Sequence, residues 1–134
     1  MNDIIDHDKI EQIIDCVCNE YSITKEMLSE RTKKQAICDA RHIIAALLSV
    51  IFERRFTQQQ ITKFVPLHDR TMVSYARQKV SCLMLFNKAF RTRIERILNS
   101  LESDEEERAL LTSKLVDFPY RQRKIKTKSL NLKV

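Results

Sequence analysis

The amino-acid sequence contains no glycine in its 134 residues. Glycine adopts positive φ without steric cost, and the tight turns of β-hairpins depend on it. A sheet protein of this length needs several such turns. The absence of glycine therefore predicts an all-α fold, a helical bundle whose helices are joined by loops that do without it.

The charge of the chain is unevenly distributed. Residues 1–30 carry two lysines against eight acidic residues, whereas residues 31–80 carry ten basic residues against three acidic ones. Residues 81–134 add twelve basic residues against seven acidic ones, and the whole chain carries +6. A basic middle and end indicate a polyanionic partner, most often nucleic acid. The alternative is a solvated basic surface without a partner.

Several classes of protein fit the sequence poorly. The start of the chain is acidic and lacks the apolar run of a signal peptide, and the longest apolar run, Ile43–Phe52, is about half of what a bilayer requires. Cys16 and Cys18 point in different directions on a helix and cannot share a metal ion, while Cys38 and Cys82 have no cysteine nearby. We expect a soluble, cytoplasmic protein without metal or other cofactor.

Helical spacing of apolar residues divides the chain into segments. We expect a first helix over residues 4–20, a short one over 25–30 capped by Thr24, and a long central one ending at the basic pair Arg54–Arg55. A further helix follows Asn87, with an apolar face at these positions: Phe86, Phe90, Ile94, Ile97, Leu98 and Leu101. Ser103 and Glu106 form a capping-box pattern that opens the last helix.

Residues 57–86 have the pattern of a helix-turn-helix. Thr57 and Gln60 form a capping box, Ile61 and Phe64 or Val65 point inward, and Pro66 ends the short helix. A turn of three or four residues leads into a longer amphipathic helix that opens with residues 68–71, and this order of elements is typical of the motif.

The second helix of this motif has two chemically distinct sides. At 100° per residue its buried side holds Val73, Ala76, Val80 and Met84, and its opposite side holds Thr71, Ser74, Tyr75 and Gln78. Asp69 and Arg70 lie at its N-terminal tip, the part that meets base edges in a helix-turn-helix. The alternative is that Asp69 is only an N-cap and the polar side is solvated.

These side chains suit the edges of bases in the major groove. Arg70 can form a bidentate pair with guanine, Asp69 can accept from the cytosine amine, and Thr71 can contact the thymine methyl. Ser74 and Tyr75 complete the predicted base-reading set. Predicted contacts to the DNA backbone or the minor groove come from a second set of polar and basic residues: Arg31, Lys33, Lys34, Gln58, Gln59, His68 and Gln78.

Residues 13–83 resemble the C-terminal DNA-binding domain of the bacterial replication initiator DnaA, a helix-turn-helix domain of Trp-repressor-like type. The similarity lies in three stretches: "RTKK" at 31–34, "ARHIIAALL" at 40–48 and "PLHDRTMVSYARQKV" at 66–80. In the last, five residues match the family motif directly: Asp69, Thr71, Val73, Ala76 and Lys79. The resemblance implies base reading by this segment, minor-groove contact by the basic stretch, and phosphate contact by the start of the preceding helix.

The chain departs from the family motif at several positions. Pro66 and Leu67 replace its glycine pair, and the second threonine is Met72. His68 stands where the family has arginine, and Arg70 stands where it has histidine. About two residues are inserted between 52 and 57. We expect the family's fold and docking mode, with a different preferred base opposite Arg70.

The chain lacks the other parts of an initiator. Without glycine it has no GxxxxGK[ST] phosphate loop, so neither an ATPase nor a bound nucleotide is expected. His7, His42 and His68 are scattered, and no nucleophile–base pair indicates an enzyme. We expect a replication or transcription regulator that binds double-stranded DNA. The alternatives are a protein-interaction module that uses the acidic N-terminal helix, and an RNA-binding protein that uses the basic tail.

We divide the chain into three parts. Residues 1–102 are expected to form the helical DNA-binding domain, residues 103–118 an acidic-capped helix, and residues 119–134 a basic tail. The segment 121–134 carries six basic residues and no acidic one, a composition typical of disorder.

Overall fold

The computed structural model describes residues 2–53, 55–66, 69–101 and 104–117, except for the side chains of residues 2–6. In these residues all regular structure is helical, which confirms the predicted all-α class. The elements, in chain order, are α1 (Asn2–Tyr21), the 3-10 helix η1 (Lys25–Ser29), α2 (Gln35–Ile51), α3 (Gln58–Ile61), α4 (Arg70–Phe86), α5 (Lys88–Leu101) and α6 (Glu105–Val116).

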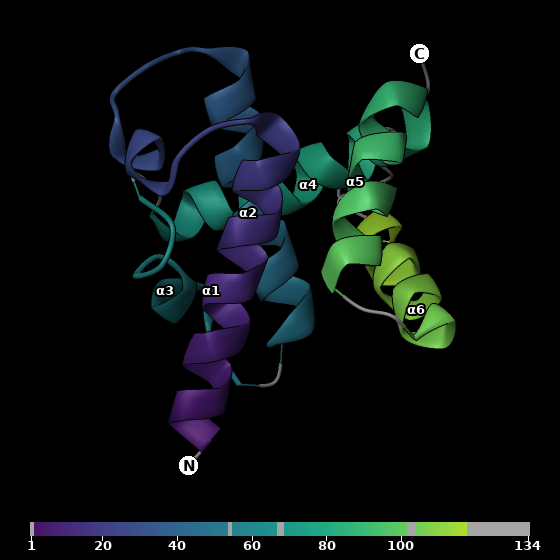
Figure 1. Cartoon of the computed structure of the whole chain (residues 1–134), viewed down its shortest axis with the longest axis horizontal. Helices are drawn as coiled ribbons and strands as arrows, with labels where there is room; N and C mark the ends of the chain where they lie inside the picture. The colour runs from purple at the N-terminus through teal and green to yellow at the C-terminus, as the bar shows by residue number, and fades with distance from the viewer. Residues whose placement is uncertain (1, 54, 67–68, 102–103, 118–134) are drawn as a thin grey trace, which may run out of the picture.

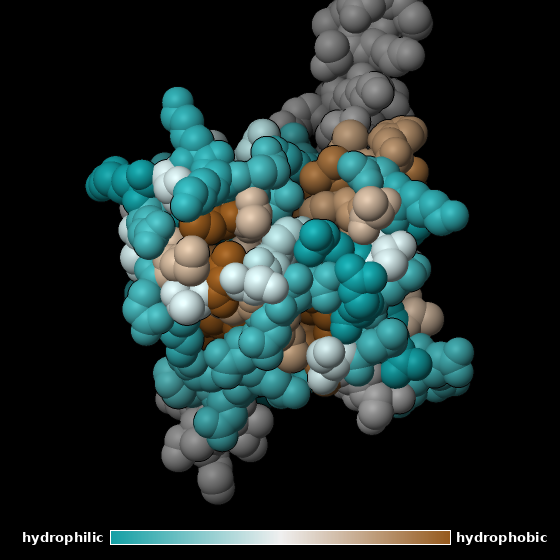
Figure 2. Space-filling view, turned by 45° about the horizontal axis from the view of Figure 1, so that its top comes forward, coloured by the Kyte–Doolittle hydropathy of each residue, from teal (hydrophilic) through white to brown (hydrophobic). Residues whose placement is uncertain are grey.

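Helix α2 is the centre of the bundle. Every side chain from Ala40 to Val50 is buried, because α1 packs on one side of α2 and α4 crosses it on the other (Figure 1). Helices α5 and α6 lie side by side and contact α4, and they also contact α1 and α2 respectively. No helix in the described ranges is long and apolar enough to span a membrane. Figure 2 shows a mostly hydrophilic surface with small hydrophobic patches.

The chain makes its sharp bends without glycine. Ser22 ends α1 with a positive φ of 56°, and the amide of Ile23 donates to the carbonyl of Cys18 at 3.0 Å. This is a Schellman-type helix end, whose left-handed position usually holds glycine. Asn87 makes the corner between α4 and α5: its amide donates to Leu83 and its side chain accepts from the amide of Phe90. One asparagine therefore caps two helices.

Two helices of the central region end earlier than the sequence predicts. Helix α2 ends at Ile51, with the amide of Phe52 donating to Leu48, so Arg55 lies beyond the helix and Arg54 falls outside the described residues. Helix α3 ends at Ile61, five residues before Pro66, because the chain turns immediately afterwards. The connection between α3 and α4 therefore spans residues 62–69, twice the predicted length.

The C-terminal helices also differ from expectation at their starts. The N-cap of α6 is Asp104, whose side chain accepts from the amide of Glu106 at 3.0 Å. Asp104 thus takes the role that the capping-box pattern predicts for Ser103, which lies outside the described residues. Phe86 is the last residue of α4 and is 78% exposed, so it does not continue the apolar face of α5. The corner at Asn87 breaks the helical period there.

The three arginines of α5 hold this helix against the rest of the bundle. Arg91 donates to the carbonyl of Met84 at 2.9 Å, and Arg96 makes a two-pronged contact with the carboxylate of Glu20. Arg93 lies over the ring of Tyr21, 4.5 Å from its centre, and also contacts Glu20. Burial raises the pKa of Tyr21 to about 12. All three arginine side chains therefore have partners within the protein.

Hydrogen bonds from α4 side chains to the last turn of α6 hold the two helices together. The hydroxyl of Ser81 donates to the carbonyl of Val116, and Arg77 donates to the carbonyl of Lys114 at 3.4 Å and to Ser49 at 3.3 Å. Burial lowers the pKa of Arg77 below its ordinary value. The carbonyls at a helix C-terminus carry partial negative charge, so a guanidinium there is favourable.

Candidate DNA interface

Helices α3 and α4 form the two parts of the predicted helix-turn-helix. The predicted capping box opens α3: Thr57 accepts from the amide of Gln60, whose side chain accepts from the amide of Thr57. Ile61 and Val65 are buried, while Phe64 is half-buried. The four residues predicted for the inner side of α4 are all buried, at 1% exposure or less: Val73, Ala76, Val80 and Met84. The opposite side of α4 is therefore directed outward.

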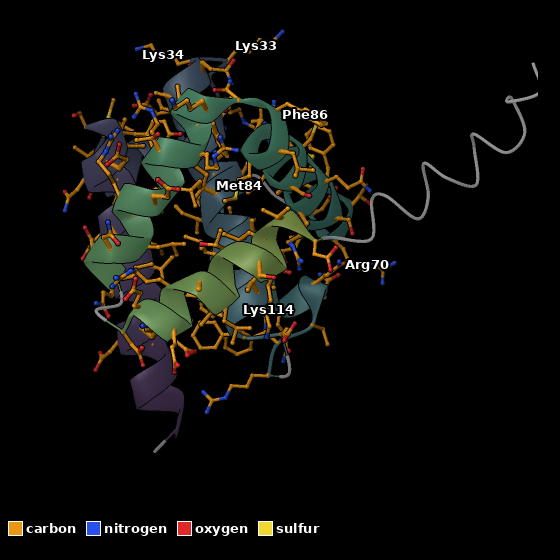
Figure 3. The ribbon with its side chains drawn as sticks, turned by 90° about the vertical axis from the view of Figure 1, so that its right-hand side faces the viewer. Lys33, Lys34, Arg70, Met84, Phe86 and Lys114 are labelled. Atoms are coloured by element: carbon orange, nitrogen blue, oxygen red, sulfur yellow. The ribbon has the colours of Figure 1, made fainter. Side chains whose placement is uncertain are left out.

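The N-terminal tip of α4 is exposed and polar. Asp69 is the N-cap, and its Oδ1 accepts from the amide of Met72 at 2.9 Å. Arg70 and Thr71 follow, both exposed, and in the described part of the chain Arg70 makes no hydrogen bond or ion pair. Figure 3 shows the Arg70 side chain reaching away from the helices. Asp69 thus holds the start of the helix, and the guanidinium beside it is available to a ligand.

A side-chain hydrogen bond joins the two helices of the motif. Nε2 of Gln58 donates to the hydroxyl of Ser74 at 2.9 Å. Both residues were predicted as DNA contacts, and the structure brings them together across the α3–α4 interface. Ser74 retains a hydroxyl proton to donate, and Gln58 retains its carbonyl oxygen. Gln59, the next residue, is exposed.

Tyr75 is held by residues on two helices. Its ring meets the ring of His42, a buried residue of α2, edge to face with 5.5 Å between the ring centres. Nζ of Lys79 lies 5.9 Å from the centre of the Tyr75 ring. Tyr75 nevertheless remains 48% exposed, so its ring is both oriented and accessible. Gln78, one turn further along α4, is half-buried.

Residues 31–34, which we call the basic loop, form the irregular segment before α2. Arg31, Lys33 and Lys34 are exposed, and Figure 3 shows the last two projecting from the top of the molecule. Lys34 is also the N-cap of α2, and its side chain makes no capping hydrogen bond. Free amides at a helix start, next to basic side chains, favour an anionic ligand such as phosphate.

Arg41 is a residue of this region that the sequence interpretation missed. It is 6% exposed, and its guanidinium donates to the carbonyl of Leu28 at 2.7 Å and to the carbonyl of Glu30. Glu30 directly precedes the basic loop and Leu28 lies two residues before Glu30, so Arg41 fixes the backbone where the loop begins. An arginine inside an apolar helix requires buried partners, and this was the available signal.

The predicted residues gather on one side of the molecule with one exception. Figure 1 shows α3, the N-terminal end of α4 and the basic loop on the same side. The exception is His68, which lies outside the described residues. The residues predicted to contact DNA on this side are cations and hydrogen-bonding groups, apart from the acid Asp69, which caps α4. The described side chains contain no His, Cys, Asp and Glu cluster that could hold a metal ion. This arrangement suits the recognition of a polyanion.

Comparison with known proteins agrees with this geometry. Residues 10–80 match the family model of the bacterial DnaA protein helix-turn-helix. Over 92 residues the chain is 28% identical to the chromosomal replication initiator protein DnaA of Campylobacter concisus (strain 13826). The similarity covers 69% of this chain and 21% of that protein, so the chain corresponds to about a fifth of its relative. No solved structure gives a significant match. Because the family model matches more than half of its residues, the chain belongs to the bacterial DnaA helix-turn-helix family.

Proposed function

We propose that this protein binds double-stranded DNA at specific sequences and regulates replication or transcription. The observation that carries the proposal is the tip of α4 in a DnaA-type helix-turn-helix, where Arg70 and Thr71 are exposed beside an N-capping Asp69. Recognition helices of this motif enter the major groove with their N-terminal residues against base edges.

The base-reading group consists of residues on the outer side of α4. Arg70 pairs with a guanine, and Thr71 contacts a thymine methyl. Asp69 uses the oxygen that does not cap the helix to accept from a cytosine amine. Ser74 and Tyr75 lie next along the helix, and the contacts that hold them support fixed positions in the groove. Fixed side chains lose little entropy on binding, which favours specificity.

The backbone-contacting group surrounds this helix. Arg31, Lys33 and Lys34 bind phosphate or enter the neighbouring minor groove, as their exposure supports. The remaining members contact phosphates on either side of the major groove: Gln58, Gln59, His68 and Gln78. They set the register of the protein on the duplex without selecting the sequence.

The proposed DNA binding by these residues requires no nucleotide hydrolysis. The sequence has no glycine and therefore no GxxxxGK[ST] phosphate loop. We propose a regulator that occupies DNA sites in the cytoplasm. Such a module competes with other proteins for a site, or recruits a partner through the acidic face of α1.

The experiment that tests this function has two parts. Selection from random duplexes should yield a preferred site, and titrations on that site should show log affinity falling with log salt at a slope of about −4 to −5, as for about five neutralised phosphates. RNA of random sequence is the control. Binding that is absent at low salt, or a slope near zero, would favour the protein-interaction module. Preference for RNA would favour the RNA-binding alternative.

A further inference from the structure

The last turn of α6 lies against the middle of α4. The hydroxyl of Ser81 donates to the carbonyl of Val116, and the guanidinium of Arg77 donates to the carbonyl of Lys114 at 3.4 Å. Helix α6 and everything after it lie outside the segment that matches the family model. The contact therefore fixes, beside α4, the point from which the rest of the chain continues.

Helix α6 contacts the side of α4 on which Arg70 stands. At about 100° per residue from Val73, Arg77 lies at about 40°, Ser81 at about 80° and Arg70 at about 60°. Arg70 and Arg77 are about 10 Å apart along the helix. Tyr75 lies at about 200°, on the other side of the proposed base-reading surface. The end of α6 is therefore next to that surface on its Arg70 side.

Helix α2 crosses α4 from one of these sides to the other. His42 of α2 meets the ring of Tyr75, with 5.5 Å between the ring centres, whereas Ser49 of α2 accepts from Arg77 at 3.3 Å. The basic loop ends about 12 Å before His42 along α2. The basic loop therefore lies beyond the Tyr75 side of α4, and the end of α6 lies on the Arg77 side.

The basic tail, residues 119–134, follows the end of α6. It carries six basic residues and no acidic one, and it lies outside the described residues. Its first cation, Arg121, comes four residues after Asp117, so the chain between the two spans at most about 14 Å. The acidic run 104–107 is at the opposite end of α6, about 10–15 Å from Lys114 along the helix. The tail therefore starts closer to α4 than to this acidic run.

We propose that the basic tail binds the DNA backbone on the Arg70 side of α4, opposite the basic loop, and that α6 holds the start of the tail there. This placement rests on the proposed binding of α4 in the major groove. A different cationic segment then meets the phosphates on each side of that groove. Figure 3 shows the required separation, with Lys34 at the top of the molecule and Lys114 well below it.

The proposed contact lengthens the bound DNA on one flank. Residues 118–134 span at most about 60 Å when extended, which exceeds the roughly 34 Å of one helical turn. The tail can therefore reach phosphates beyond the base pairs that α4 reads. Its cations attract phosphates of any sequence, so the tail adds affinity without adding sequence choice.

Trimming the duplex from either end tests this placement. The preferred site is prepared with about one helical turn of flanking DNA on both sides, on one side only, and on the other side only. Removing one flank should weaken binding of the full chain several-fold and leave a chain without residues 121–134 unaffected. Removing the other flank should weaken both of these proteins equally. A variant with alanine at Arg31, Lys33 and Lys34 should respond to the first flank and not to the second.

Lengthening the connection separates the position of the tail from its charge. A flexible insert of about 20 glycine and serine residues after Asp117 keeps all six cations and releases them from the end of α6. The tail should then use either flank, so removing the first flank alone should cost much less than it costs the full chain. Circular dichroism and thermal unfolding check that the bundle is intact in each variant.

Four results would overturn the proposal while leaving the proposed function in place. The chain without residues 121–134 could bind the preferred site with the same dependence on both flanks as the full chain. The tail and the basic loop could depend on the same flank. The long insert could leave the flank dependence unchanged. Deletion of residues 121–134 could raise affinity, which would mean that the tail covers the acidic run 104–107 or the reading tip.

Failure of the proposed function would look different. A protein that has no preferred site, or that binds no duplex at low salt, contradicts the function and this placement together. A chain without residues 121–134 that still selects the same site confirms the function, whatever the flanks show.

Discussion

Arg70 is the residue on which the proposed sequence preference depends most. If its guanidinium pairs with a guanine edge, Arg70→Ala should cost about 1–3 kcal/mol on the preferred site and much less on scrambled DNA. Arg70→Lys should recover only part of the lost affinity, because an ammonium group cannot form the planar pair of hydrogen bonds that a guanidinium makes with guanine. Fluorescence anisotropy on both duplexes at two salt concentrations measures these differences. Lys88→Ala, which removes an exposed charge at the other end of α4, is the matched control.

Two other roles of Arg70 would give different results. If it clamps a phosphate, affinity should fall equally on both duplexes and the salt slope should shrink by about one. If it is only a solvated charge, neither quantity should change.

Ser22 is the position where a glycine would help this chain. Its positive φ of 56° costs a residue with a Cβ about 1 kcal/mol. Ser22→Gly should therefore raise the free energy of unfolding by roughly 0.5–1 kcal/mol, measured by denaturant titration, even though glycine loses more entropy on folding. Ser113 is an exposed residue within α6, and Ser113→Gly should lower the free energy of unfolding. Equal destabilisation by both would contradict the helix-end explanation.

Single residues show what the sequence could predict about the site. Helical periodicity placed Val73 and Val80 on the buried side of α4 because that side contacts one continuous core. It could not reveal that His42 meets Tyr75, since the two residues are far apart in sequence and meet only through the crossing of α2 and α4. It assigned Phe86 to α5, since periodicity alone cannot detect a corner between two helices.

At the scale of elements, Arg41 couples η1 and α2 to the basic loop. Arg41→Lys keeps the charge and loses the paired contacts with two carbonyls, so we expect a loss of about 2–3 kcal/mol of stability. DNA affinity should also fall, because the loop is no longer held. In a protein whose three loop cations are replaced by alanine, the same change should have little further effect on DNA affinity.

The wild type, Arg41→Lys, the triple alanine variant at residues 31, 33 and 34, and the variant that combines both changes form a double-mutant cycle. The triple change at residues 31, 33 and 34 should weaken preferred and random duplexes by similar factors, as expected for phosphate contacts. Losses that add fully would mean that Arg41 influences DNA binding by another route. A triple change that affects only the preferred site would indicate sequence reading in the minor groove.

The ends of elements were harder to predict than their existence. The capping box of Thr57 fixed the start of α3 correctly, because its two hydrogen bonds are local. Pro66 did not set the end of α3, since the chain had already turned at Thr62. Asp104 and Ser103 are both residue types that cap helices well, so the sequence alone could not choose between them, and the structure has Asp104 as the N-cap.

At the scale of the whole molecule, the six basic residues of 121–134 are a separate source of affinity. They lie outside the described residues, and their charge alone predicts attraction to DNA. Removing residues 121–134 should lower affinity for random duplexes several-fold and reduce the salt slope, while the melting temperature changes by less than about 2 °C. A larger drop would mean that Leu130 or Leu132 packs on the bundle.

The burial of α2 on all sides also determines the order in which backbone amides exchange hydrogen with solvent. Amide protons in the middle of α2 can exchange with solvent only when α1, α4 and the α5–α6 pair separate from it together. We expect these amides to exchange last, at the rate of global unfolding, and those of the basic loop to exchange first. Exchange measured in heavy water should therefore follow one cooperative unit that includes α5 and α6, although neither helix lies in the region that matches the family.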